Sequence, residues 1–463
     1  MKNFVLGLII SFISHAAWAG LDLSLPDMNI PEMGDPSSSV LSYTEEQDLG
    51  KKLYRQLRGS QAVIEDPELS SWIRALGNRL VSRALGTRGS FYFLIIDKPS
   101  VNAFAMPGGV IAVHTGLILN TESESELAAV LSHEIAHVSQ RHIARMFAKN
   151  KDNVWKTGLG VVAAAIAASQ DPALGQAVIT ATLASQMQKQ LNFSRQAEFE
   201  ADRVGMRILA SGGFDPEGMP TFLSKLEPSE AAYQDITEYL RSHPLSIDRL
   251  SDTRNRSKKY GSRPHKDDKD YAYAKAKLQA LSRTRLKARG LNKTTLQHYL
   301  SGWKNIKAGQ FALALQQASG GNQANQILRA YALNGLGKYD QTITLLKPLI
   351  VNYPDQEALL VPLLQAYLAK GKTKIAWQLV QKSYISEQSS LEFLEVRQAV
   401  ANAVGQISDA LLMAAERYIR LAEYKQAQTL LLQATRNSTV GIANEAKLQN
   451  LLTQVNQMLK NSQ

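Results

Sequence analysis

The apolar positions at the start of the chain form one short run between polar residues. Lys2 precedes an apolar segment from Phe4 to Ile13, and small residues at positions 17 and 19 follow it. This order is typical of a secretory signal peptide. A membrane-spanning helix needs about 20 apolar residues, and this run is shorter. The pattern therefore predicts a signal peptide over residues 1–19, cleaved after Ala19, and export of the chain.

Further along, the spacing of apolar residues predicts helices and strands in alternation. Residues 20–40 show no period and are rich in Pro, Asp, Ser and Met, which predicts an extended leader. Helical periodicity follows over two segments, residues 44–57, opening with a capping box at Thr44, and residues 67–85. Two apolar runs, Phe91–Ile96 and Val110–His114, predict strands, and we expect a hairpin-like pair joined through residues 102–109.

A third helix is predicted from Thr121, where the sequence TESESE supplies overlapping capping boxes. This helix carries His133-Glu134-Ile135-Ala136-His137. Four residues at about 100° each place the two imidazoles about 40° apart on one face, so both can bind one tetrahedral Zn²⁺. Glu134 follows His133 directly and can reach the open coordination position of the metal. There it can act as general base and take the proton from the zinc-bound water. His142 points away from that face and is expected to be a core or supporting residue.

Composition restricts what else the chain can do. It has 463 residues, 44% of them hydrophobic and 20% charged, and no cysteine. Disulfides, thiol nucleophiles and thiolate metal sites are excluded, so a metal must be bound by His and carboxylates. The net charge of +11 favours anionic surfaces. An exported chain with no recognisable groove-reading module is not expected to bind nucleic acid.

The third metal ligand is expected in the sequence SRQAEFEAD, residues 194–202. Glu198 and Asp202 are four residues apart and share a helix face, whereas Glu200 lies on the other side. Glu198 is therefore the predicted ligand. Asp202 is the predicted carboxylate that holds a ligand imidazole in the correct tautomer. The alternative is an acidic, solvated helix face with arginine partners.

With these motifs in place, the chain resembles the zinc peptidases that include HtpX and the CAAX prenyl proteases, and within them a soluble, periplasmic type. Four motifs in family order carry the resemblance, NAFAMPGG at residues 102–109, HEIAH at 133–137, SRQAEFEAD at 194–202 and SHPLSIDR at 242–249. The resemblance implies one Zn²⁺ per chain on His133, His137 and Glu198. It also implies misassembled outer-membrane β-barrel proteins as substrates and the barrel-assembly machinery as partner.

The fourth motif places His243 before Pro244, and a residue before proline favours an extended conformation, which predicts a loop. Two roles compete for it, an oxyanion donor and a fourth zinc ligand that keeps the enzyme latent. The resemblance implies such a switch, and we expect the ligand role. Arg249 is the expected transition-state support. The segment from Asn102, Ala103 and Phe104 onward is expected to offer a strand edge to an extended substrate.

Two further segments bear on the architecture. Residues 158–184 form two Ala-rich stretches, each too short to span a membrane. A hairpin that covers the active site or touches a bilayer and a packed hairpin without a membrane role stay equally open. After a polar linker, turn-and-helix copies begin at Gly309, Gly337, Gly371 and Ala422, and two of them lie 34 residues apart, the tetratricopeptide period. The alternative is a plain helical bundle.

The predicted fold is α+β and mostly helical. A gluzincin-type metalloprotease domain with a small β-sheet, residues 41–262, precedes an all-α tetratricopeptide solenoid, residues 263–463, that binds partner proteins. We expect few contacts across the linker near Pro264. The predicted function is an exported zinc metalloendopeptidase, and the family resemblance implies that it acts in outer-membrane protein assembly and quality control. The alternative is a chaperone or assembly adaptor with latent or dispensable proteolysis.

Overall fold

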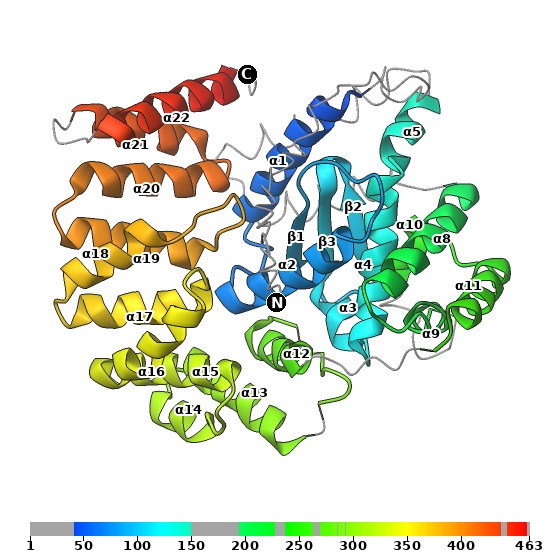
Figure 1. Ribbon diagram of the computed structural model, residues 1–463, viewed down its shortest axis with the longest axis horizontal. Coiled ribbons are helices and arrows are strands. Elements are labelled where there is room, and N and C mark those ends of the chain that lie inside the picture. The colour runs from blue at the N-terminus through cyan, green and yellow to red at the C-terminus, as the bar shows by residue number, and fades with distance from the viewer. Residues whose placement is uncertain are drawn as a thin grey trace, which may run out of the picture. The chain divides into compact units, whose positions relative to one another are not determined.

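The computed structural model describes residues 41–149, 194–226, 237–262, 269–284, 286–291, 293–436 and 442–460. The predicted signal peptide, the leader and the Ala-rich segment 158–184 lie outside these residues. Helices dominate the described chain and one small sheet accompanies them (Figure 1), which confirms the predicted α+β, mostly helical class.

The helices fall into an N-terminal set around the sheet and a C-terminal set. The first set is α1 (Tyr43–Gly59), α2 (Pro67–Val81), α3 (Thr115–Asn120), α4 (Glu124–Ser139), α5 (His142–Lys149), α8 (Arg195–Ser211), α9 (Gly218–Ser224), α10 (Thr237–Ser242) and α11 (Ile247–Tyr260). The second set is α12 (Lys269–Leu281), α13 (Thr294–Lys307), α14 (Phe311–Gln317), α15 (Gln323–Gly335), α16 (Tyr339–Asn352), α17 (Glu357–Ala369), α18 (Thr373–Lys382), α19 (Leu391–Ala403), α20 (Ile407–Arg420), α21 (Tyr424–Arg436) and α22 (Ile442–Lys460).

The sheet has three strands, β1 (Tyr92–Ile96), β2 (Ala103–Met106) and β3 (Val110–His114), in the order β1-β3-β2. The predicted pairing is wrong in one respect, because β1 runs parallel to β3 and the hairpin is formed by β2 and β3. The segment expected to connect two strands contains a strand itself. Gly108 turns the chain at φ 72°, and a Cβ there would lie 2.3 Å from the Glu46 carbonyl oxygen of α1.

Helix α1 begins two residues earlier than the sequence pattern suggests. Ser42, not Thr44, is the N-cap, and its side chain accepts from the backbone N–H of Glu45. The Glu45 carboxylate accepts in turn from the Ser42 backbone N–H at 2.9 Å. Ser-x-x-Glu is the same reciprocal capping arrangement in another register.

Helix α4 lies at the centre of the first core and sets the position of the site. Leu127, Leu131 and Ile135 are fully buried in a cluster with residues of β1, β3 and α8. At Gly205 of α8 a Cβ would meet the His133 backbone at 3.1 Å. The absent side chain lets α8 lie close against α4 beside His133, which brings the two chemically active helices together.

The second set of helices packs in sequence as helical hairpins (Figure 1). Gly337, Gly371 and Gly405 close three of these hairpins at φ 70°, 67° and 76°, a left-handed conformation that favours glycine. Each of these glycines follows the previous one by 34 residues. The sequence pattern missed the copy at Gly405 and placed the last one at Ala422, which has φ 58° but lies between α20 and α21. The tetratricopeptide assignment stays a prediction.

Helix α12 contradicts the expectation of few contacts across the linker. Lys277 is 1% exposed, and its Nζ lies 2.8 Å from Asp66 Oδ2 and 2.8 Å from Glu68 Oε2 at the start of α2. The same ammonium lies 3.8 Å from the ring centroid of Trp303 in α13. Lys277 therefore joins the two sets of helices, and a chain cut at Pro264 would lose it. The domain boundary at residues 262 and 263 stays a prediction.

Replacing Lys277 by methionine is expected to lower the free energy of unfolding by about 3–5 kcal/mol, because it leaves two largely buried carboxylates without their counter-charge. Denaturant unfolding followed by circular dichroism measures this change. Lys370→Met is the matched control, since Lys370 pairs with a 66% exposed Asp340 side chain and such pairs contribute about 0–1 kcal/mol. Equal losses in the two variants would contradict a stabilising role of the buried pair.

Candidate metal centre

Two histidines and a glutamate are positioned by helix α4. Ser123 caps the helix by accepting from the Glu126 backbone N–H. His133 is 3% exposed, and Glu134 and His137 are fully buried. The four-residue spacing puts both imidazoles on one face, with ring centroids 4.6 Å apart.

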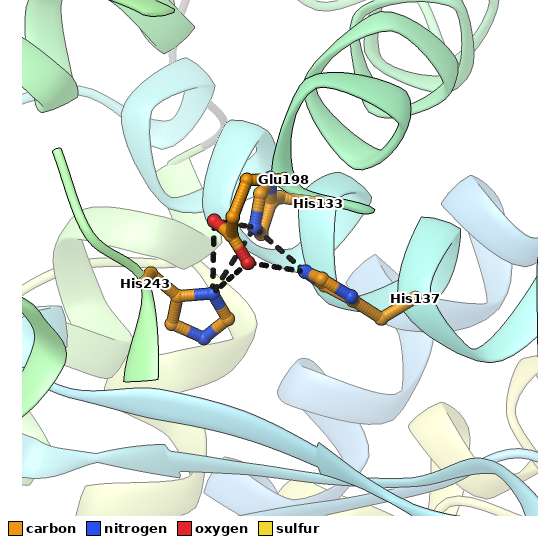
Figure 2. A group of neighbouring side chains, drawn as sticks. All are labelled: His133, His137, Glu198 and His243. Carbon is orange, nitrogen blue, oxygen red and sulfur yellow. Dashed lines mark hydrogen bonds and ion pairs between the residues drawn. The ribbon is translucent and has the colours of Figure 1, made fainter. Parts of the chain in front are cut away.

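Two further ligand groups meet these imidazoles. Glu198 comes from the first turn of α8, which is capped by Ser194, and His243 follows the C-terminal residue of α10. Figure 2 shows the four side chains, His133, His137, Glu198 and His243, pointing toward one another. All four are buried, and their ligand atoms lie within 4.8 Å of one another. Sequence reasoning named all four positions.

The distances between ligand atoms fit a tetrahedral metal site. Metal–nitrogen bonds of about 2.0–2.1 Å in tetrahedral geometry separate neighbouring ligand atoms by roughly 3.3 Å. His133 Nε2 lies 3.0 Å from His137 Nε2 and 3.3 Å from His243 Nδ1. Glu198 Oε1 lies 3.3 Å from His137 Nε2 and 3.1 Å from His243 Nδ1. Imidazole nitrogens and carboxylate oxygens are also common zinc ligands in proteins.

Asp202 and Arg249 support these ligands from outside. His133 Nδ1 lies 2.9 Å from Asp202 Oδ1. The Arg249 guanidinium donates to both oxygens of Asp202, at 2.7 and 2.9 Å, and its Nη1 lies 2.7 Å from Glu198 Oε2. Burial alone would raise the pKa of Asp202, but Arg249 and His133 hold it below its usual range. Arg249 is thus engaged with two carboxylates.

The electrostatic surroundings of His133 and Glu198 favour nearby positive charge, whereas burial, with the adjoining His133 and His243, holds the pKa of His137 well below its usual range. Burial alone would lower the pKa of His133, but hydrogen bonds to Asp202 and Glu198 raise it to about 10. Burial would raise the pKa of Glu198, yet the adjoining histidines hold it well below its usual range. Surroundings that attract a proton in this way also attract a metal ion.

Glu134 lies beside the four ligands without joining them. Its Oε2 accepts from the Ala105 backbone N–H of β2 at 2.9 Å, and its Oε1 lies 3.4 Å from His243 Nε2. Burial raises the pKa of Glu134 above its ordinary value, against the influence of His243 and His133. A carboxylate with a raised pKa is a stronger base, which suits proton abstraction.

Comparison with known proteins identifies the family. Residues 67–257 match peptidase family M48. The chain is 31% identical to the beta-barrel assembly-enhancing protease of Escherichia coli K12, over 93% of this chain and 91% of that protein. The chain belongs to this family of M48 peptidases.

Other relatives agree with this assignment. The chain is 33% identical to the beta-barrel assembly-enhancing protease of Yersinia pestis, over 84% of this chain and 76% of that protein. It is 36% identical to a mitochondrial metalloendopeptidase of Arabidopsis thaliana, over 34% of this chain and 29% of that protein. The chain is therefore a metalloprotease, as the resemblance of its motifs implied, and its His and Glu cluster is a candidate site for a metal ion.

In this M48 metalloprotease the predicted substrate edge belongs to strand β2. Ala103 and Phe104 lie in β2, directly after Asn102, and β3 is the only described strand that pairs with β2, which makes β2 an edge of the described sheet. All three residues are buried. Among the residues that the structure describes, neither polar atom of the Asn102 side-chain amide has a hydrogen-bond partner. The role of these residues as a substrate edge stays a prediction.

Two residues support the other imidazole, and the sequence pattern placed both of them away from the ligands, with His142 as a core or supporting residue. His142 Nδ1 lies 2.8 Å from His137 Nδ1, and His142 Nε2 lies 3.3 Å from Glu200 Oε2. A continuous helix would turn His142 away, but α4 ends at Ser139 and Arg141 has φ 50°. The break returns His142 to His137.

Among the described residues, no helix combines the length and apolar character needed to cross a membrane.

Proposed function

We propose that the chain is an exported, zinc-dependent metalloendopeptidase with His133, His137 and Glu198 as its metal ligands and one Zn²⁺ per chain. The observation that supports this most strongly is the convergence of the ligand atoms at tetrahedral separations beside the Glu134 carboxylate, whose Oε1 lies 3.4 Å from His243 Nε2. When bound, zinc supplies a Lewis acid that polarises the scissile carbonyl.

The chain's own residues account for the rest of the chemistry. Glu134 is the proposed general base, and the Ala105 N–H fixes one of its oxygens so that the other faces the site. Asp202 accepts from His133 Nδ1 and thereby keeps Nε2 available to the metal. The contacts of Arg249 with Asp202 and Glu198 favour a positioning role over direct support of the transition state.

His243 is the proposed regulatory ligand. Its Nδ1 lies 3.3 Å from His133 Nε2 and 3.1 Å from Glu198 Oε1, which favours the ligand role over that of an oxyanion donor. Four protein ligands close a tetrahedral site, and a closed site has no position for substrate. The Tyr239 ring packs on His243 with centroids 4.7 Å apart and holds it in this arrangement. The described state is therefore proposed to be the latent one.

The proposed substrates are misassembled outer-membrane β-barrel proteins in the periplasm. The relatives that cover most of the chain are named beta-barrel assembly-enhancing proteases, and the predicted signal peptide over residues 1–19 agrees with export. The helices from residue 263 onward are the proposed repeat domain that binds the barrel-assembly machinery. Contact of residues 158–184 with the membrane surface is part of the same proposal. The names of these relatives do not favour the alternative of a chaperone or assembly adaptor with dispensable proteolysis.

Degradation of a purified outer-membrane β-barrel protein tests the proposed substrate class. The mature, zinc-loaded chain carrying His243→Ala is expected to cleave the barrel protein while it is unfolded and to spare it once folded in detergent. Casein serves as an unrelated unfolded substrate, and Glu134→Gln in the same chain controls for contaminating proteases. Cleavage of casein with an intact unfolded barrel protein would contradict the proposed substrate class and leave the peptidase activity standing.

A further inference from the structure

The Nδ1 atoms of the two imidazoles on α4, His133 and His137, face different groups. His133 Nδ1 lies directly beside a carboxylate, that of Asp202, at 2.9 Å. His137 Nδ1 instead lies 2.8 Å from a third imidazole, that of His142, which is 3% exposed. The carboxylate comes one step later, because His142 Nε2 lies 3.3 Å from Glu200 Oε2. Arg145 donates to the same oxygen of Glu200 at 2.8 Å and anchors it.

The contacts determine where the protons lie. His137 turns Nε2 toward Glu198 and His133, so as a ligand it carries its proton on Nδ1. The contact that the structure describes for that proton is Nδ1 of His142, which accepts it only when unprotonated. His142 then carries its own proton on Nε2, the atom that faces the Glu200 carboxylate. Each group thus fixes the tautomer of the next.

We infer that His142, backed by Glu200, is a positioning residue that holds His137 in the tautomer and orientation needed for metal binding. The inference rests on the proposed metal ligands and deepens them. His142 itself is no ligand, since it meets His137 on the side away from Nε2. Loss of such an outer partner typically lowers metal affinity about 10–100-fold, whereas a residue that merely fills the core leaves the affinity of the folded chain unchanged.

The test is the zinc affinity of the full mature chain, measured by competition with a chromogenic chelator. His142→Phe keeps the ring and removes the acceptor, and is expected to bind Zn²⁺ about 10–100-fold more weakly than the unmodified chain. His142→Asn places an amide oxygen where Nδ1 was and is expected to recover most of the affinity. The visible spectrum of the cobalt-substituted chain is expected to change in His142→Phe and to be kept in His142→Asn.

If His142→Phe does not fold, a variant of Glu200, the partly exposed partner of His142, still tests the inference. Glu200 is partly exposed, so Glu200→Ala is expected to fold and to weaken Zn²⁺ binding toward the lower end of the same range, whereas Arg203→Ala, at an exposed position of the same helix, should leave it unchanged. Unchanged affinity in both His142→Phe and Glu200→Ala would overturn the inference. Equal weakening by His142→Phe and His142→Asn would also overturn it, because the acceptor would then be irrelevant. Tight binding by His137→Phe would instead refute the proposed ligands.

Discussion

Glu134→Gln is expected to lower the rate of peptide hydrolysis by roughly 10²–10⁴-fold, the usual contribution of a general base. The amide has nearly the same shape as the carboxylate but does not take up a proton at neutral pH. Glu134 is not among the ligand atoms of the cluster, so the metal content should stay at one per chain. Cleavage of a fluorogenic peptide, with zinc measured on the same sample, separates the two effects.

Glu122→Gln is the matched control for this substitution. Its side chain is 52% exposed and pairs with Arg289 at the surface, so we expect an unchanged rate. Loss of zinc together with activity in Glu134→Gln would point to a ligand role for this residue. In cells, full rescue of every envelope phenotype by Glu134→Gln would contradict the view that proteolysis is the principal function.

His243→Ala is expected to raise proteolysis, including self-cleavage. With its imidazole removed, His133, His137 and Glu198 still hold the metal, and the fourth coordination position becomes available to substrate. If the closed state accounts for about 90–99% of the molecules, its removal raises the rate roughly 10–100-fold. Time courses of casein cleavage and of the intact chain on denaturing gels measure both activities.

The same variant separates the two roles considered for His243. An oxyanion donor would make His243→Ala slower on every substrate, and that result would refute the latent state. His298→Ala is the control, because it also removes an imidazole. His298 is exposed on α13 and is not one of the clustered ligands, so both rates should stay unchanged. Zinc bound by His243→Ala confirms that three ligands suffice.

Local patterns predicted most of the candidate site, because its main parts are set by single helices. His133 and His137 share a face through the helical period alone, and so do Glu198 and Asp202. His142 was misplaced where that period ends, at the turn through Arg141. A helical wheel carries no information across a residue with positive φ.

Pairing between distant segments was beyond the reach of local patterns. The apolar runs of β1 and β3 are equally compatible with parallel and antiparallel pairing, and the choice depends on β2, which reads as a turn. Lys277 looks like an ordinary surface lysine in its own helix. Its carboxylate partners Asp66 and Glu68 lie more than 200 residues earlier in the chain.

The metal content of the purified mature chain tests the central claim most directly. Elemental analysis after dialysis is expected to give one zinc per chain for the unmodified protein. Replacement of both His133 and His137 by alanine leaves only two of the four converging ligands and should reduce it to a small fraction, with folding checked by circular dichroism. A folded, unmodified chain without stoichiometric zinc, or ligand variants that retain it, would contradict the account.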